Sequence, residues 1–169
     1  GSHCMHPYNG NKGSIFNNGD ITTTSFHATK VLNTLEGGAI FTNSRAIQNR
    51  VQKLRNFGFT SEEEVEDISS NGKLNEISAA IGLLQLHSLK LSILRRQRID
   101  QKYRQMLKSI EGIRLMEIPS NDANYNYSYF PIFIDSSHQK MRDFVYQQLR
   151  QKNIYARKYF YPLIPDFKA

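Results

Sequence analysis

The chain has little of the material that several classes of protein require. It contains one cysteine, Cys4, and no tryptophan among its 169 residues. A single cysteine excludes a disulfide framework and a cysteine-rich metal site. No uninterrupted apolar run reaches the ~18 residues of a membrane span, and no signal peptide opens the sequence. We therefore expect a cytoplasmic protein that binds no metal and enters no membrane.

Positive charge is abundant but dispersed. The formal net charge is +7, from 22 basic and 15 acidic residues. The densest basic cluster falls on a predicted helix and fits a solvated helix surface; it comprises Lys90, Arg95, Arg96, Arg98 and Lys102. No zinc finger or RNA-binding signature accompanies this charge, so no nucleic-acid partner is expected. A non-enzymatic dimerisation or binding module, docking acidic partners on a basic helical face, remains an alternative.

The first half of the chain predicts strands followed by a helix. Residues 1–12 begin with Gly-Ser-His and are expected to be a tag-derived, disordered lead. The β-branched stretch 21–26 and its predicted partner 38–42 are typical of buried strands, with Lys30 on the connection between them. The pair Asn43-Ser44 offers an N-cap for an amphipathic helix that ends before Gly58. The polar, acidic stretch that follows predicts an exposed loop, with a short helical turn as an alternative.

The longest helical pattern begins near Leu74 and runs to about Ile110. Its expected buried side comprises Ile77, Ala80, Ile81, Leu84, Leu91, Leu94, Ile99, Tyr103 and Leu107. A pattern this long suggests a break or a bridge between domains. Because its first half is nearly apolar and its second half is charged, we expect a boundary near residues 88–96. This divides the chain into domains at 13–94 and 95–169.

The second domain is predicted to mix strands with one helix. Residues 113–118 and 127–134 have strand patterns, residues 139–152 a helical one, and residues 154–161 a further strand pattern. This order indicates an α+β or split βαβ arrangement. The chain as a whole is therefore expected to be α/β, with an α+β C-terminal part.

Lys30 is the candidate reactive group. It lies between the apolar stretch that ends at Ala28 and the pair Gly37-Gly38, with hydroxyls and an imidazole close in sequence. A lysine in such a setting is a candidate for a desolvated, nucleophilic amine. The ordinary alternative is a solvated surface charge, since most lysines are of that kind.

The run SFHATK, followed after five residues by EGGAI, resembles the DegT/StrS-type sugar aminotransferases. These are pyridoxal-phosphate enzymes of fold type I. The resemblance extends through the run NGKLNE at 71–76 to RKYFYP at 157–162, and so covers essentially the whole chain after Gly13. It implies that the chain holds part of the large cofactor domain, followed by a small α+β domain.

The resemblance also implies roles for individual residues. Lys30 would form the Schiff base with pyridoxal 5'-phosphate and move protons, and Ser25 would bind the cofactor phosphate. His27 would tune the lysine or pack against the cofactor, although a satisfied core histidine is an equal alternative. Asn71 and Lys73 would reach the phosphate of a neighbouring subunit, which requires a homodimer with shared active sites. A polar helix N-terminus is the plain alternative for that pair.

The implied substrate is a nucleotide-linked keto-deoxysugar, carried by dTDP or UDP, with glutamate as the amino donor. The runs around Lys30 and Tyr161 most resemble enzymes of dTDP-4-keto-6-deoxyglucose, which serve nucleotide-sugar and O-antigen lipopolysaccharide biosynthesis. Arg157 would meet a pyrophosphate, and Tyr159 or Tyr161 a sugar or base face. A lysine rather than a histidine at position 30 favours transamination over the dehydration that one subgroup performs.

The same resemblance predicts that the chain alone is inactive. The family's aspartate that pairs with the pyridine nitrogen precedes the lysine motif by more residues than this chain provides. Asp20 is too close to Lys30 to take that part. We therefore expect a fragment that lacks the N-terminal half and the C-terminal end of its parent.

Overall fold

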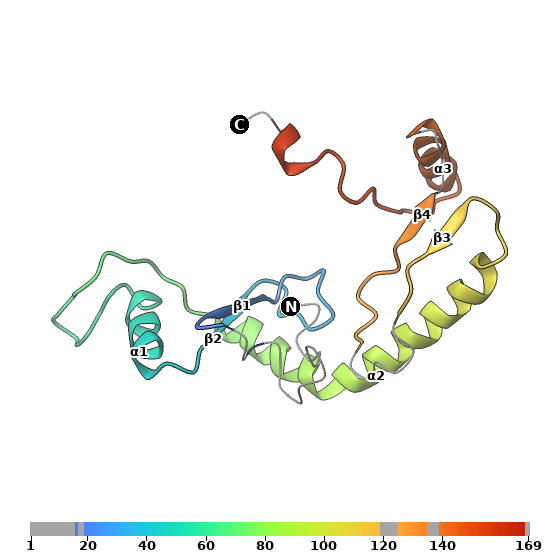
Figure 1. Cartoon of the computed structure of the whole chain (residues 1–169). Helices are drawn as coiled ribbons and strands as arrows, with labels where there is room; N and C mark the ends of the chain where they lie inside the picture. The colour runs from blue at the N-terminus through green and yellow to red at the C-terminus, as the bar shows by residue number, and fades with distance from the viewer. Residues whose placement is uncertain (1–15, 17–18, 119–124, 135–138, 168–169) are drawn as a thin grey trace. The chain divides into compact units, whose positions relative to one another are not determined.

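A computed structural model describes residues 16, 19–118, 125–134 and 139–167. The described elements are, in order, two strands, two helices, two further strands, a third helix and a short 3-10 turn (Figure 1). The chain divides into two compact units, Gly1–Lys102 with Ile118–Phe130, and Tyr103–Glu117 with Pro131–Ala169. The predicted lead at residues 1–12 lies outside the described residues.

The first unit opens with an antiparallel hairpin. Strand β1 (Thr22–Ser25) pairs with β2 (Gly38–Phe41) in a register that places Thr22 opposite Phe41 and Ser25 opposite Gly38. Both strands lie within the predicted stretches, so this prediction is confirmed. The β-branched threonines of β1 suit the pleated conformation. The hairpin therefore presents the connection that carries Lys30 at its Ser25–Gly38 end.

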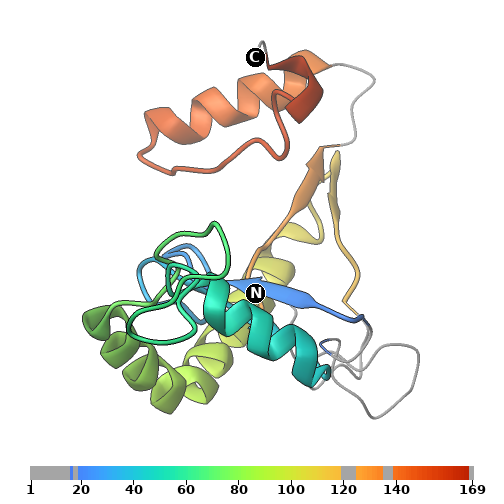
Figure 2. The same cartoon turned by 90° about the vertical axis from the view of Figure 1, so that its left-hand side faces the viewer.

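Helix α1 (Arg45–Leu54) follows β2 directly. The Ser44 hydroxyl accepts a hydrogen bond from the Ile47 amide at 3.4 Å, which confirms the predicted N-cap. An exposed loop returns from α1 and lies back along its end (Figure 2): the Gly72 amide donates to the Arg55 carbonyl at 2.8 Å, and Lys53 pairs with Glu66 at 2.5 Å. The acidic stretch is thus a loop, as predicted.

Helix α2 (Glu76–Leu107) is one continuous helix of 32 residues. Asn75 caps its start, because the Asn75 side-chain oxygen accepts from the Ser78 amide at 2.8 Å. The helix belongs to both compact units, so it bridges them without a break. The predicted domain boundary between residues 94 and 95 stays a prediction.

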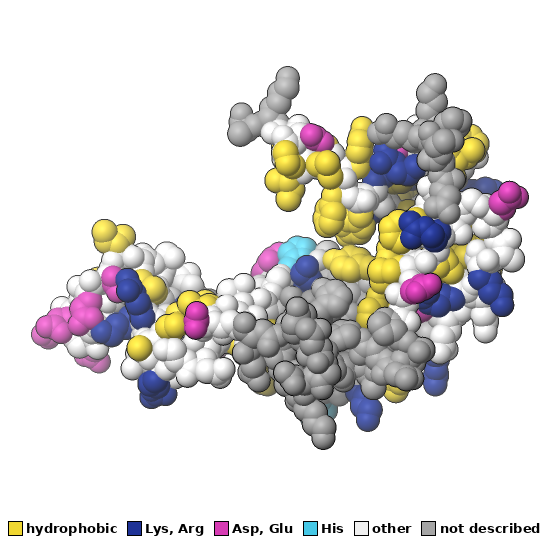
Figure 3. Space-filling model, viewed as in Figure 1, with side chains coloured by type: hydrophobic (Ala, Val, Ile, Leu, Met, Phe, Trp, Pro, Cys, Tyr) yellow, Lys and Arg dark blue, Asp and Glu magenta, His cyan; other side chains and the backbone are white. Residues whose placement is uncertain are grey.

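The expected buried side of α2 is largely exposed, which corrects the interpretation of its apolar pattern. Ile77 is 75% exposed and Leu84 71%, whereas the buried residues of the helix are Ser78, Gly82 and Asp100. Figure 3 shows hydrophobic side chains at the surface of the described chain. Large apolar side chains become buried only against an opposing surface, and α2 meets the rest of its unit with small residues instead.

The same exposed apolar residues give α2 the length and composition of a membrane span. Its most apolar 18-residue window has a mean hydropathy of 1.5 and is 11% buried. Core helices of soluble proteins meet this criterion equally well, so it does not by itself indicate a membrane protein. The expectation that the protein enters no membrane stays a prediction.

The second unit contains a small hairpin and an amphipathic helix. Strand β3 (Ile113–Leu115) pairs antiparallel with β4 (Ile132–Ile134), and helix α3 (Gln139–Gln151) follows. Both strands are shorter than predicted. The predicted strand at residues 154–161 is wrong: that segment is irregular and is followed by a 3-10 turn at Ile164–Asp166. A strand needs a neighbouring backbone to pair with, and no described strand pairs with this segment.

Packing between the Lys30 connection and α2 can be tested at Gly82. A Cβ added there would lie 2.8 Å from the Thr34 Cγ2 methyl, too close for an ordinary contact. Alanine is normally about 1 kcal/mol better than glycine inside a helix. We expect Gly82→Ala to lower the free energy of unfolding instead, by about 1 kcal/mol or more, as measured by urea denaturation followed by circular dichroism.

The control for this prediction is a double-mutant cycle. Thr34→Ser removes the methyl group and keeps the hydroxyl, so Gly82→Ala should become neutral or stabilising in that background. Gln101→Ala, at an exposed position of the same helix, should change stability by less than about 0.5 kcal/mol. A Gly82→Ala protein more stable than the unmodified chain would contradict the close contact.

Candidate functional site

The site is built on the lysine loop, residues 26–37, which joins β1 to β2. Two backbone hydrogen bonds close it: the Phe26 amide donates to the Gly37 carbonyl at 2.8 Å, and the Thr34 amide donates to the Phe26 carbonyl at 2.9 Å. Lys30 lies four residues from each partner of the second bond. The loop is therefore closed at its base, and Lys30 lies midway between Phe26 and Thr34.

Lys30 is half-buried and its backbone is held on both sides. Its amide donates to the His27 carbonyl at 2.9 Å, and its carbonyl accepts from the Asn33 Nδ2 at 3.0 Å. The next residue, Val31, is 7% exposed. Among the described residues, it is the one hydrophobic residue that is buried. Within the described part of the chain, no carboxylate forms an ion pair with the Lys30 amine. The amine is thus available for chemistry rather than committed to a structural contact.

Ser25 and His27 lie close to Lys30 in the sequence, and each forms local hydrogen bonds. The Ser25 hydroxyl oxygen accepts from the His27 amide at 3.2 Å, which leaves its proton free to be donated. The His27 Nδ1 accepts from the Thr29 amide at 3.2 Å, so the neutral ring carries its proton on Nε2. That atom faces a Glu36 carboxylate oxygen at 3.5 Å. His27 is exposed and polar-bonded, so it is not a satisfied core histidine.

The two glycines after Glu36 are required by close approach, as the sequence suggested. Gly37 has φ +145°, and a Cβ there would meet the Thr34 Oγ1 at 2.6 Å and the Leu74 Cδ1 at 2.7 Å. A Cβ at Gly38 would lie 2.7 Å from the Thr24 carbonyl oxygen. Side chains at either position would push the loop away from β1 or from Leu74.

Asn71 and Lys73 lie on the loop before α2, and the structure uses them locally. The Lys73 ammonium donates to the Asn56 side-chain oxygen at 2.8 Å and lies 4.3 Å from the centre of the Phe57 ring. The Asn71 side-chain oxygen accepts from the Lys73 amide at 3.2 Å. The Lys73 ammonium therefore already has local partners. The side-chain NH2 group of Asn71 donates no hydrogen bond among the described residues.

The candidate substrate residues belong to the second unit. Arg157 is exposed, and Tyr159 lies edge-on to Phe160, with their ring centres 4.9 Å apart. Tyr161 is contacted by two cations, Arg142 at 4.6 Å and Lys158 at 5.1 Å from its ring centre. The segment is held to α3 by these contacts rather than by a sheet.

Asp143 organises that cluster. Lys158 Nζ and Arg142 Nη2 each lie 2.9 Å from the same Asp143 oxygen. The hydrogen bond from Arg142, followed by the one from Lys158, holds the pKa of the Asp143 carboxyl below its usual value. One carboxylate thus fixes two cations that contact the Tyr161 ring.

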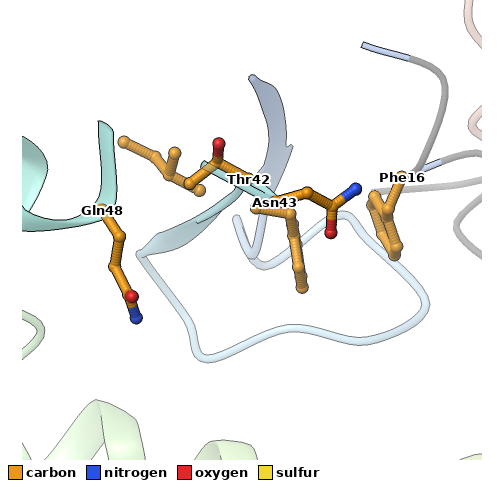
Figure 4. A pocket seen from close by; sticks show the side chains of 6 residues that line it. Phe16, Thr42, Asn43 and Gln48 are labelled. Atoms are coloured by element: carbon orange, nitrogen blue, oxygen red, sulfur yellow. The ribbon is translucent and has the colours of Figure 1, made fainter. Parts of the chain in front are cut away.

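A shallow hollow of about 250 Å³ lies at the other end of the first hairpin (Figure 4). It is lined by Phe16, Ile40, Phe41, Thr42, Asn43 and Gln48. Thr22 pairs with Phe41 at that end, whereas Ser25 pairs with Gly38 at the end that carries the lysine loop. The hollow therefore belongs to the packing of Phe16 on Phe41, with ring centres 4.1 Å apart, and not to the Lys30 site.

Sequence reasoning missed three residues of the site: Asn33, Thr34 and Glu36. Asn33 and Thr34 tie the loop together through their side chains, and Glu36 faces His27. Asparagine and threonine in a short connection are a signal for such side-chain to backbone bonds. That signal was present in the run VLNTLEGG, but it does not say which backbone group each side chain reaches.

Comparisons with known proteins converge on one family. The model of the DegT/DnrJ/EryC1/StrS aminotransferase family matches residues 7–168. A dTDP-4-amino-4,6-dideoxy-D-glucose transaminase of Shigella dysenteriae is 46% identical over 157 residues, covering 93% of this chain and 42% of the relative. An Escherichia coli protein of the same name is 46% identical over 132 residues, covering 78% and 35% respectively. The chain thus spans about two-fifths of the length of these relatives.

Solved structures agree. DesI, determined in the presence of its TDP-sugar product, has a TM-score of 0.82 and 30% identity, covering 96% of this chain and 41% of that one. The PMP form of the sugar aminotransferase Spr1654 from Streptococcus pneumoniae also has a TM-score of 0.82, at 19% identity, and supports the fold alone.

The Asp143 cluster predicts a pH dependence in the second unit. Because the folded pKa of Asp143 is below the unfolded value of about 3.9, its stabilising contacts are present above that value and are lost as pH falls through the folded pKa. We expect the Tyr161 ring resonances to shift over this acidic range. Asp143→Asn should abolish the shift. At near-neutral pH its spectrum should resemble that of the unmodified chain at acidic pH.

NMR titration between about pH 2 and pH 6 provides the measurement. Glu62→Gln, at an exposed position of the acidic loop, is the matched control and should leave the Tyr161 titration unchanged. A Tyr161 shift that persists in the Asp143→Asn chain would assign the pH dependence to another group.

Proposed function

Because the chain belongs to the DegT/DnrJ/EryC1/StrS aminotransferase family, we propose that it is the lysine-bearing part of a pyridoxal-phosphate enzyme that aminates a nucleotide-linked keto-deoxysugar. One observation carries this: the half-buried Lys30 lies midway between Phe26 and Thr34, in a loop that backbone hydrogen bonds close at its base. The predicted α/β class and partial fold type I architecture are confirmed by the structural relatives.

The described residues fit the cofactor. Pyridoxal phosphate, when bound, supplies an aldehyde that condenses with amines and a ring that withdraws electrons. Lys30 offers the amine, and the Ser25 hydroxyl retains a proton to donate to a phosphate oxygen. His27 and Glu36 belong to the same loop, and their side chains face each other at 3.5 Å. Asn71 has an amide donor suited to a phosphate, which supports its proposed part across a homodimer.

Lys30 is suited to two tasks in such an enzyme. Its amine would hold the cofactor covalently, and once released it would act as a base that accepts a proton from the substrate carbon. Both tasks need an amine whose approach is fixed, because misplacement by about 1 Å can reduce a rate by roughly 10²-fold. The bonds at the Lys30 amide and carbonyl supply that fixed approach.

The sugar substrate is proposed from the relatives and from the second unit. The Shigella and Escherichia proteins are named for dTDP-4-amino-4,6-dideoxy-D-glucose, which favours a dTDP-4-keto-6-deoxy sugar as the acceptor and C4 as its aminated carbon. A Helicobacter pylori relative is named for a UDP-linked sugar, at 27% identity. Exposed Arg157 suits a pyrophosphate, and Tyr159 and Tyr161 suit a sugar or base face. Glutamate as donor and a cytoplasmic location complete the proposal.

Trapping with borohydride tests the assignment of Lys30. The chain, incubated with pyridoxal phosphate, should develop visible absorbance, and reduction followed by peptide mapping should place the label on Lys30. Lys30→Ala should remove the label, while Lys108→Ala, at an exposed lysine, should leave it unchanged. In the full-length protein that carries this chain, Lys30→Ala should lower kcat by about 10³-fold or more.

Two results together would refute the proposal. Label scattered over many lysines, together with full activity of the Lys30→Ala full-length protein, would exclude Lys30 as the cofactor lysine. If the protein is a non-enzymatic dimerisation or binding module, neither this chain nor the full-length protein should develop an absorbance band with pyridoxal phosphate. The exposed apolar side of α2 would then be the feature to examine for association.

A further inference from the structure

The Asn33 side chain makes two hydrogen bonds across the lysine loop. Its Nδ2 donates to the Lys30 carbonyl at 3.0 Å, and its Oδ1 accepts from the Leu35 amide at 3.4 Å. Leu35 has φ +68°, a conformation that leucine rarely adopts without local support. One carboxamide therefore connects the residue that carries the amine to the turn that leads back to β2.

Thr34 fixes the base of the same loop. Its amide donates to the Phe26 carbonyl, and its hydroxyl donates to the Glu36 carbonyl at 2.6 Å. Thr34 is 4% exposed, and its methyl group lies against Gly82 of α2. The base of the loop is thereby anchored to a helix, while its tip depends on Asn33.

The two backbone groups of Lys30 are thus both bonded inside the loop. The His27 carbonyl accepts from the Lys30 amide, and Asn33 donates to the Lys30 carbonyl. The first bond is an ordinary turn bond that many sequences support. The second requires a side-chain donor three residues after the lysine, which Asn33 provides and a carboxylate of the same shape does not.

We propose that Asn33 is a positioning residue for the Lys30 amine. By donating to the Lys30 carbonyl it fixes the direction in which the Lys30 side chain leaves the backbone, so that only side-chain rotations remain to be restricted when the amine reacts. This inference rests on the proposed function for the identity of the electrophile. It concerns the loop itself, however, and can be measured without cofactor.

Three variants separate the two hydrogen bonds. Asn33→Leu removes both, Asn33→Asp keeps the acceptor for Leu35 and loses the donor to Lys30, and Asn33→Ser retains a hydroxyl that can donate to a carbonyl three residues earlier. Asn49→Leu and Asn49→Asp, at an exposed position on α1, are the matched controls. Circular dichroism checks that each chain keeps its helices.

The first readout is the initial rate of the borohydride-trapped label at Lys30, followed over a range of pH. We expect Asn33→Leu and Asn33→Asp to lower this rate by roughly fivefold, the factor that one ordinary hydrogen bond contributes. Asn33→Ser should stay within about twofold of the unmodified chain. A pH profile of unchanged shape for the uncharged Asn33→Leu would separate lost positioning from an altered amine pKa.

The second readout needs no cofactor. Hydrogen exchange of the Lys30 amide and acetylation of the Lys30 amine relative to Lys108 report the order of the loop directly. The exchange rate of the Lys30 amide and the relative acetylation rate of the Lys30 amine should both change in Asn33→Leu and Asn33→Asp. Neither rate should change in Asn33→Ser or in the Asn49 variants.

The results distinguish failure of this inference from failure of the proposed function. If the unmodified chain gives no Lys30 label, the proposed function loses its support in this chain, and the exchange and acetylation data still decide the role of Asn33. Unchanged exchange and acetylation in Asn33→Leu and Asn33→Asp would overturn the inference. Equal changes in exchange and acetylation in all three Asn33 variants would also overturn it, because the hydrogen-bond donor to the Lys30 carbonyl would then not be the cause.

Discussion

The rest of the first unit depends on the closure of the lysine loop at Thr34. This residue bonds to Phe26 and Glu36 and rests on Gly82, so it joins the hairpin, the loop and α2 at one point. Val31 is the buried hydrophobic residue of the described chain. With so little apolar burial, the local order at Lys30 comes from backbone and side-chain hydrogen bonds and from close packing of small groups. Such contacts are short-ranged and directional, which suits the positioning of one amine.

The small residues of α2 have a functional consequence. A helix that met the loop with leucines would keep the backbone of the loop several ångströms further away, whereas Gly82 lets the Thr34 methyl approach the helix backbone. Gly37 likewise permits the close approach of Leu74 and of the Thr34 hydroxyl. The base of the loop thus makes two close approaches at Thr34, each made possible by a missing side chain. The exposed apolar residues of α2 take no part in holding it.

Much of this arrangement was predictable from sequence, and the parts that were not have physical reasons. The β-branched run before Lys30, the Ser44 cap and the helical period after Leu74 depend on neighbours in sequence, and they were placed correctly. The burial of Ile77 and Leu84 was wrong because periodicity shows which side of a helix is apolar and not whether anything covers it. The strand at 154–161 was wrong for a related reason, since an extended pattern does not provide a pairing partner. Asn33 was missed because its importance depends on which carbonyl it reaches.

The two units hold their candidate site residues by different physical means. Hydrogen bonds between neutral groups hold Lys30, and these do not change with pH in the ordinary range. Around Tyr161, Asp143 balances only one of the charges of Arg142 and Lys158, so one positive charge remains beside the aromatic ring. The local order of the C-terminal segment is therefore coupled to the charge of Asp143, whereas the geometry of Lys30 is set within its own loop.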